Sequence, residues 1–160
     1  MLAPLHLRLS DEQATRGLGR TLGALLQPGF AVHLAGELGS GKTTLARGIV
    51  HGLGFAGKVK SPTFALVEPY VDSRLSLYHF DFFRFKNQME WEEAGLRECF
   101  NDRSICIVEW PEKAGVRLPP ADLRIRLAAP PRGGRDATIE AHTEIGRSCL
   151  TELARLCRAR

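Results

Sequence analysis

The sequence predicts one α/β domain with three layers and a mostly parallel central sheet, on three observations. Strand-like and helix-like segments alternate along the chain, which is typical of a sheet with helices on both faces. Residues 105–108 (ICIV) form a wholly apolar run between polar residues, as expected for a strand buried on both faces of a parallel sheet. The 160 residues, 44% of them hydrophobic, are enough for one core, so we expect residues 1–160 to fold as a single domain.

The N-terminal part of the chain has the pattern of an amphipathic helix. Apolar side chains recur at helical spacing over residues 14–25, and Pro28 ends the pattern. Ser10 followed three residues later by Gln13 resembles a capping box, so we expect the helix to begin there. Residues 31–35 (AVHLA) are short and mostly apolar and predict a strand.

The next segment, residues 36–44 (GELGSGKTT), contains the P-loop pattern of Gly, four residues, Gly, Lys, then Ser or Thr. Such a loop wraps a triphosphate with its backbone N–H groups, and only Gly tolerates the backbone angles and the close approach. Lys42 then supplies a charge to the β and γ phosphates, and Thr43 supplies a hydroxyl to magnesium. A Gly-rich structural turn is the alternative, but the strand before the loop and the helical spacing after it favour a P-loop NTPase fold. The expected nucleotide-binding residues are Gly36, Glu37, Leu38, Gly39, Ser40, Gly41, Lys42, Thr43 and Thr44.

The rest of the chain continues the alternation, and no internal repeat or linker divides it. The expected elements are a helix from about residue 45 to 53, a loop running into a strand at 61–70, a strand at 75–80, a helix at 90–100, the strand at 105–108, strands at 122–127 and 137–141 on either side of a turn at 130–134, and a basic C-terminal helix at 144–160.

Two acids follow expected strands, and both are candidate ligands for Mg²⁺. Glu109 comes directly after the apolar run, where P-loop proteins commonly carry the carboxylate that holds magnesium, and Asp81 closes the preceding strand. Ligands of α/β sheets bind at the carboxyl ends of the strands, so these acids and Thr43 are expected to form the oxygen surroundings that Mg²⁺ prefers. For Asp81 a simple turn or cap is the alternative role.

The net charge of +4 arises near the C-terminus. Residues 147–160 contain four arginines against Glu152 alone, which leaves +1 for the rest of the chain. Apolar residues at Ile145, Cys149, Leu153 and Leu156 also form a stripe, so a terminal helix with a solvated polar face is favoured over a nucleic-acid contact.

The remaining composition predicts a cytoplasmic protein. No apolar run approaches the ~20 residues that span a bilayer, and the first residues lack the pattern of a signal peptide. The four cysteines form no CxxC pair and have no zinc-like spacing with His, so we expect reduced thiols.

Four motifs in order, GELGSGKTT, VKSPTFALVEPY, LYHFDFFR and ICIVEWPEK, give the chain a resemblance to the TsaE (YjeE) family over about residues 10–142. The resemblance implies a bacterial cytoplasmic ATPase that uses ATP and Mg²⁺ and acts with the proteins TsaB and TsaD in making the threonylcarbamoyl modification of adenosine in certain tRNAs. An indirect or weak contact with tRNA is a further expectation, and no membrane contact is expected.

The resemblance also implies roles for single residues. Lys42 stabilises charge at the γ-phosphate, Asp81 orients the attacking water, and Thr63 in the SPTF loop holds that water or senses the nucleotide state. Asp11 and Arg135 are the nearest matches to residues that touch the adenine. Phe83 stands where the family usually has Tyr, so a role for that hydroxyl does not carry over.

Two other functions fit the same P-loop. The first is a small-molecule kinase in which Arg84, Arg97 and Arg103 bind a phosphorylated acceptor. The second is an interaction module in which ATP orders the SPTF loop to dock a partner and hydrolysis is incidental. We expect weak ATPase activity alone that rises with the partners, because a domain this small is not expected to supply a complete lid.

Overall fold

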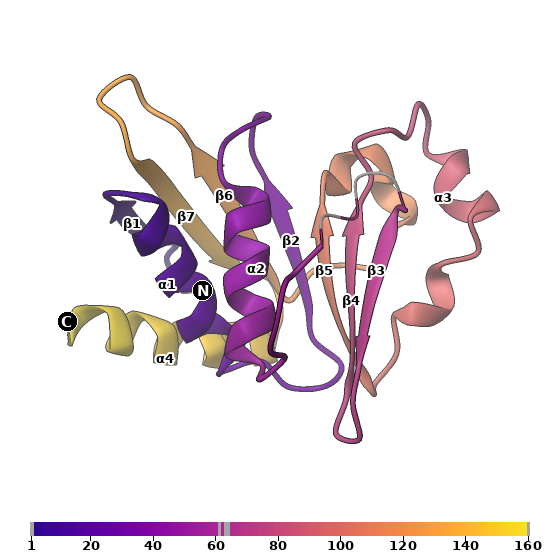
Figure 1. Cartoon of the computed structure of the whole chain (residues 1–160), viewed down its shortest axis with the longest axis horizontal. Coiled ribbons are helices and arrows are strands. Elements are labelled where there is room, and N and C mark those ends of the chain that lie inside the picture. Colours follow the sequence, from indigo (N-terminus) through magenta and orange to yellow (C-terminus); the bar gives the residue numbers. More distant parts are fainter. Residues whose placement is uncertain (1, 61, 63–64, 160) are drawn as a thin grey trace.

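The computed structural model describes residues 2–60, 62 and 65–159, in which seven strands form one sheet in the order β1-β7-β6-β2-β5-β4-β3 (Figure 1). Parallel pairing joins β6 to β2, β2 to β5 and β5 to β4, and the other three pairings are antiparallel. Only β7 and β3 therefore run against the other five described strands, and the predicted mostly parallel α/β sheet is confirmed. The strands are β1 (Leu5–Leu9), β2 (Ala31–Ala35), β3 (Val67–Val71), β4 (Ser76–Asp81), β5 (Ser104–Glu109), β6 (Leu123–Ala128) and β7 (Arg135–Ala141).

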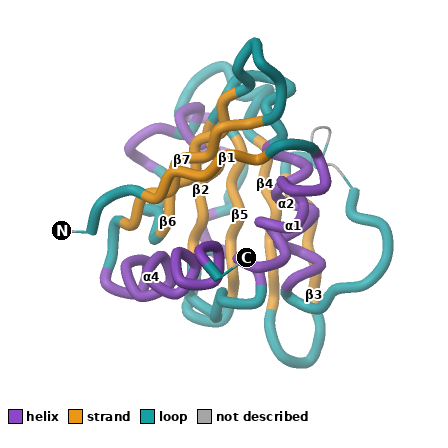
Figure 2. Tube along the Cα trace, turned by 90° about the vertical axis from the view of Figure 1, so that its left-hand side faces the viewer, coloured by secondary structure: helices purple, strands orange, loops and turns teal. Residues whose placement is uncertain are grey.

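Side chains of the helices α1, α2 and α4 share one apolar cluster with one face of the sheet, and shorter elements cover part of the other face. Figure 2 shows β2, β5, β4 and β3 following one another across the sheet, with the helices α1, α2 and α4 nearby. The helical elements are α1 (Glu12–Gly23), α2 (Lys42–Gly52), α3 (Met89–Glu93) and α4 (Glu144–Arg158), with the 3₁₀ turns η1 (Arg97–Cys99), η2 (Pro111–Lys113) and η3 (Gly115–Arg117).

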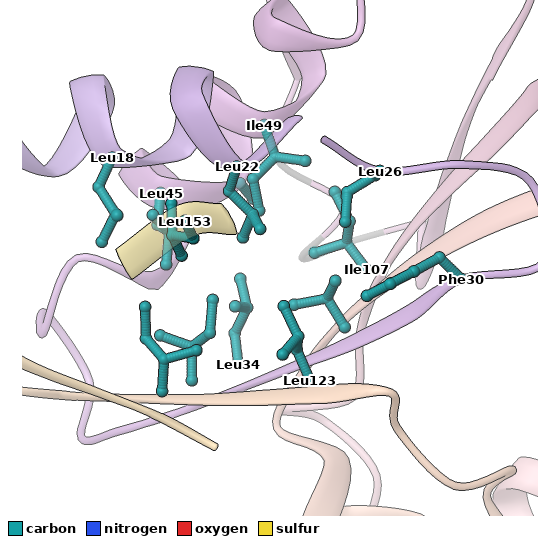
Figure 3. Close-up of a cluster of buried hydrophobic side chains, with 14 of the residues drawn as sticks. Leu18, Leu22, Leu26, Phe30, Leu34, Leu45, Ile49, Ile107, Leu123 and Leu153 are labelled. Carbon is teal, nitrogen blue, oxygen red and sulfur yellow. The ribbon is translucent and has the colours of Figure 1, made fainter. Parts of the chain in front are cut away.

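The main core lies between α1, α2, α4 and the sheet (Figure 3). Strand residues such as Leu34 and Leu123 and helix residues such as Leu22 and Leu45 have no exposed surface. Each such side chain contributes about 1.5–3 kcal/mol relative to an exposed one. This packing holds α2, and with it the loop that precedes α2, against the carboxyl ends of the parallel strands.

The helices α1 and α2 approach each other closely through glycines. A Cβ on Gly19 would lie 2.5 Å from the Leu45 carbonyl oxygen, and a Cβ on Gly48 would lie 2.3 Å from the Arg16 carbonyl oxygen. Gly23 and Gly52, four residues further along each helix, are as tightly placed. Only glycine allows the two backbones to come this near, so these positions hold the C-terminal halves of α1 and α2 side by side.

The opposite face of the sheet carries a second, aromatic cluster. Phe80 and Phe82 are fully buried against Trp91 of α3, and Phe100 stacks on Phe80 with ring centroids 5.2 Å apart. The predicted third layer is therefore present, but short elements build it and it covers the β4 and β5 part of the sheet.

The element boundaries correct two expectations and add one strand. The N-cap of α1 is Asp11, whose carboxylate accepts from the Ala14 N–H at 2.7 Å, and not Ser10. The strand β1 was not predicted. The expected helix at 90–100 ends at Glu93, because Gly95 adopts a left-handed conformation (φ 67°) and η1 follows.

In α4, Cys149 and Leu153 are buried as predicted, but Ile145 is 53% exposed and Leu150 is buried in its place. The helix exposes Arg147, Arg155 and Arg158, of which Arg155 pairs with Glu152. Among the described residues no helix has both the length and the apolar character needed to cross a membrane.

Candidate nucleotide-binding site

The loop between β2 and α2 lies at the carboxyl edge of the parallel strands, as the sequence predicts. Gly36, Gly39 and Gly41 have positive φ angles of 146°, 79° and 104°, which side chains other than glycine rarely adopt. A Cβ on Gly36 would also lie 2.4 Å from the Leu127 carbonyl oxygen. The glycines are therefore required by the backbone path of the loop.

The Lys42 side chain lies inside this loop and is only 4% exposed. Its Nζ donates to the carbonyl oxygens of Gly36 at 2.6 Å and Glu37 at 2.8 Å. Burial lowers the pKa of Lys42, while the carboxylates of Glu109 and others oppose that shift. Carbonyl groups of the loop thus hold the ammonium group in place.

An aromatic wall stands beside the Lys42 ammonium group. Nζ lies 4.4 Å from the Trp110 ring centroid, and the Phe83 ring is 5.0 Å from the same indole, centroid to centroid. Trp110 has a left-handed backbone (φ 59°, ψ 50°), which is uncommon for a residue other than glycine. This conformation turns the chain directly after β5 and accompanies the placement of the indole beside the lysine.

Polar side chains from two other elements contact Glu109 of β5. The Thr43 hydroxyl, on the first turn of α2, donates to Glu109 Oε1 at 3.0 Å. His79 Nε2, from β4, lies 2.6 Å from Glu109 Oε2. Thr43 and Glu109 line the same cleft as Lys42, so the carboxylate predicted at the end of β5 does meet the predicted P-loop hydroxyl.

Asp81 is the last residue of β4 and pairs in register with Glu109 of β5. It is 5% exposed and lines the same cleft, and its Oδ1 accepts from the Phe83 N–H at 3.0 Å. Asp81 therefore has the turn role considered above. Its side chain also lies at the wall of the cleft.

A cleft of about 470 Å³ joins these groups to the start of α1. Asp11, predicted from the resemblance, lies on its wall, as do Glu12 and Thr15, which the sequence did not single out. Leu38, at the tip of the loop, is 75% exposed beside the cleft. The cleft is lined by Asp11, Glu12, Thr15, Leu38, Gly39, Gly41, Lys42, Thr43, Thr44, Asp81, Phe83, Glu109, Trp110, Gly134 and Arg135.

Arg135, at the start of β7, reaches the P-loop itself. Its Nε donates to the Ser40 carbonyl at 2.8 Å and its Nη2 to the Gly39 carbonyl at 3.0 Å. The resemblance suggested an adenine contact for this residue. The structure places its guanidinium against the loop backbone, at the wall of the cleft.

The remaining predicted residues are Thr63 of the SPTF loop and three arginines. Thr63 and its neighbour Ser61 lie outside the described residues. Of the three arginines considered for a kinase acceptor, none lines the cleft. Arg97 pairs with Glu92, and Arg103 precedes β5, at the end of that strand opposite to Glu109.

The donor set fits a magnesium ion held together with phosphates. The described residues contain no cluster of three or more His, Cys, Asp or Glu side chains arranged to hold a metal by themselves. Mg²⁺ usually keeps several waters and takes one or two protein oxygens plus substrate phosphates. Thr43 and Glu109, which contact each other beside the P-loop, supply the one or two protein oxygens that such a magnesium ion needs.

Comparison with known proteins gives a consistent result. A family model for the threonylcarbamoyl adenosine biosynthesis protein TsaE matches residues 9–137. The tRNA threonylcarbamoyladenosine biosynthesis protein TsaE of Haemophilus influenzae is 36% identical over 89% of this chain and 93% of the relative. The protein of the same name from Streptomyces coelicolor is 43% identical over 70% of this chain and 77% of the relative. A crystal structure of Bacillus subtilis YdiB superposes with a TM-score of 0.83 at 30% identity, covering 97% of both chains.

Proposed function

The chain belongs to the TsaE family of threonylcarbamoyl adenosine biosynthesis proteins, and from this premise we propose that it is a magnesium-dependent P-loop ATPase acting in tRNA threonylcarbamoyladenosine biosynthesis. One observation carries the proposal. Lys42 Nζ, held by the carbonyls of Gly36 and Glu37, and the Thr43–Glu109 pair lie together in a single cleft lined by the P-loop.

Triphosphate binding follows from the loop and the helix behind it. The first N–H groups of α2 have no partner within the helix, and the positive end of the helix dipole favours an anion there. Lys42 adds a full positive charge at the same point. A phosphate chain along Gly39–Thr44 would therefore exchange contacts with water for several charge-assisted hydrogen bonds.

Thr43 and Glu109 are the residues that would hold magnesium. When bound, the ion would help to neutralise the negative charge that develops during phosphoryl transfer. Glu109 keeps its place through contacts with both Thr43 and His79.

Hydrolysis needs a water aligned with the γ-phosphate more than it needs a strong base, because the transition state of phosphoryl transfer is loose. Asp81 is the candidate for orienting this water, since it lies at the carboxyl end of β4 and lines the cleft. Lys42 stabilises charge on the phosphoryl oxygens. Thr63 is a further candidate for holding the water or sensing the nucleotide.

The partners proposed are TsaB and TsaD, by family resemblance, with any contact to tRNA weak or indirect. Apolar side chains at the mouth of the cleft support a partner near the nucleotide, since Leu38 and Phe83 are 75% and 40% exposed there. We propose a cytoplasmic location, in keeping with four described cysteines that form no disulfide.

The test is co-purification with TsaB and TsaD in ATP, in ADP and without nucleotide, with ATP turnover measured on the same samples. We expect slow turnover by the protein alone, faster turnover with the partners, and no turnover by Lys42→Ala. Equal turnover with and without the partners would contradict partner stimulation, and failure to form a complex in every nucleotide state would contradict the partnership.

A further inference from the structure

We propose that Arg135 is a positioning residue that holds the nucleotide-free P-loop in its phosphate-binding shape, and does not read the adenine base. The inference rests on the proposed nucleotide site and adds a residue outside the P-loop motif to it. Arg135 lies 95 positions after Ser40 in the sequence, and the strand β7 places it beside the P-loop.

The guanidinium is committed to backbone carbonyls. Nε donates to Ser40 O at 2.8 Å, Nη2 to Gly39 O at 3.0 Å and Nη1 to Gly134 O at 2.7 Å. The planar fork of arginine suits two adjacent acceptors in a way that the single ammonium of lysine does not. All three nitrogens of the fork thus have protein partners in the absence of nucleotide.

The geometry of the peptide bond lets these contacts fix the direction of N–H groups in the loop. In a planar trans peptide the C=O and the following N–H point in opposite directions. By holding Ser40 O, Arg135 fixes the Gly41 N–H on the side of the peptide away from itself. That N–H directly precedes the first turn of α2, whose N–H groups lack helical partners and are available to an anion.

The second contact connects Arg135 to the P-loop lysine. Holding Gly39 O orients the Ser40 N–H, which donates to Glu37 O at 3.1 Å. Glu37 O also accepts from Lys42 Nζ at 2.8 Å. Arg135, the loop backbone and Lys42 therefore form one connected network, in which loss of the guanidinium would free two carbonyls to rotate toward the phosphate side.

A readout that needs no nucleotide tests the proposal directly. Amide hydrogen exchange of segment 36–44 is measured in the nucleotide-free protein for the wild type, Arg135→Ala and Arg132→Ala. Arg132 is the matched control, because it lies in the same turn region and pairs with Asp136 on the surface. We expect exchange in this segment to rise at least about tenfold in Arg135→Ala, since hydrogen bonds to charged groups contribute about 1.5–3 kcal/mol each.

Exchange at residues 105–108, in the buried strand β5, separates a local effect from general unfolding. Unchanged exchange in this strand, with faster exchange at 36–44, supports the proposal. Unchanged exchange at 36–44 overturns it, and so does an equal rise in both segments. This result does not depend on ATP, so failure of the proposed ATPase function would be seen separately as absence of nucleotide binding by the wild type.

Nucleotide titrations distinguish loop positioning from base recognition. If Arg135 shapes the loop, Arg135→Ala lowers the affinities for ATP and for GTP by the same factor, at least about tenfold, because both nucleotides carry the same triphosphate. If Arg135 reads adenine, only ATP binding weakens, and the proposal is wrong. Arg135→Lys should recover part of the affinity at most, because one ammonium does not reproduce the two-carbonyl geometry.

Discussion

His79 Nε2 lies 2.6 Å from Glu109 Oε2, and both side chains are buried. The other oxygen of the carboxylate accepts from the Thr43 hydroxyl at 3.0 Å. His79 Nδ1 is buried and has no partner among the described residues, so the imidazole is committed to Glu109 alone. A carboxylate oxygen accepts, so Nε2 donates its hydrogen to Glu109. The orientation of the carboxylate is thus set by two neighbours on different elements before any ion arrives.

From this pair we predict that His79 supports the magnesium-dependent part of nucleotide affinity. His79→Phe should lower ATP affinity about tenfold in magnesium and leave it unchanged in EDTA, because ligand-orienting partners are typically worth 10–100-fold in metal affinity. His79→Gln, whose amide can still donate to Glu109, should recover most of the loss. Calorimetric titration with and without magnesium measures both.

The control for this prediction is His33→Phe, which replaces another buried histidine, on β2, where Arg124 and His142 are the charged groups that affect its pKa. It should keep the wild-type response to magnesium. A loss of ATP affinity in EDTA that equals the loss in magnesium would show that His79 only supports the fold.

A second prediction concerns Asp81. Asp81→Ala removes both the charge and the acceptor for the Phe83 N–H, whereas Asp81→Asn keeps an oxygen that can accept this hydrogen bond. If Asp81 orients water, both variants should bind ATP within about threefold of the wild type and lose about 10²-fold in partner-stimulated kcat, since small errors in positioning cost that much. Activity in Asp81→Asn with loss only in Asp81→Ala would mean that the residue is a structural cap.

The same variants separate an ATPase from a nucleotide-dependent interaction module, and Glu109→Ala joins them because Glu109 is a proposed magnesium ligand. A module would still bind its partners and support tRNA modification when ATP binds but is not hydrolysed. For an enzyme we expect modification to stop together with turnover. Partner capture and tRNA modification, assayed on the same variant preparations, decide between the two.

A third prediction uses two glycines on one helix. Gly19→Ala should destabilise the protein by about 1–3 kcal/mol or more, because its Cβ would meet backbone atoms of Leu45 and Gly48 that no side-chain rotation can move. Gly17→Ala, whose Cβ meets nothing within 4 Å, should stabilise it by up to about 1 kcal/mol through helix propensity. Urea midpoints of the two variants should therefore shift in opposite directions, and a shift of the same sign would contradict the close packing of α1 on α2.

The fourth prediction is a dependence of stability on pH through His33. Burial, followed by Arg124 and His142, lowers the pKa of His33 from 6.5 to about 4. Between pH 6.5 and pH 4 the unfolded state binds a proton at this histidine and the folded state does not. The contribution of neutral His33 to the free energy of unfolding is therefore complete above pH 6.5 and is lost as the pH falls toward 4. The cost between pH 7 and pH 5 is about 2 kcal/mol.

His33→Gln, which does not titrate, should remove that part of the slope between pH 6.5 and pH 4. Urea unfolding at pH 7 and pH 5 measures it for both proteins. An identical loss of stability in the wild type and the variant would show that other groups cause the pH dependence.

Local sequence patterns predicted much of the fold, because some segments allow only one kind of backbone structure. The run at 105–108 and the glycines at 36–41 became β5 and the P-loop turn, since a fully apolar strand and left-handed glycines allow few alternatives. The helix at 90–100 was wrong because Gly95 broke it, and β1 was missed because its pairing partner, β7, lies about 130 residues away. Strand pairing over such a distance leaves little trace in local periodicity.

By itself the sequence determined the P-loop motif, with Lys42 and Thr43 in it, because spacing within one turn and helix fixes the relative positions of these residues. It also placed Glu109 at a strand end. Only the tertiary structure decided which side chains meet there. The contact of His79 with Glu109 depends on the register of β4 with β5. The contact of Arg135 with the P-loop depends on the position of β7 in the sheet. Packing between elements sets those distances, and no spacing along the chain encodes them.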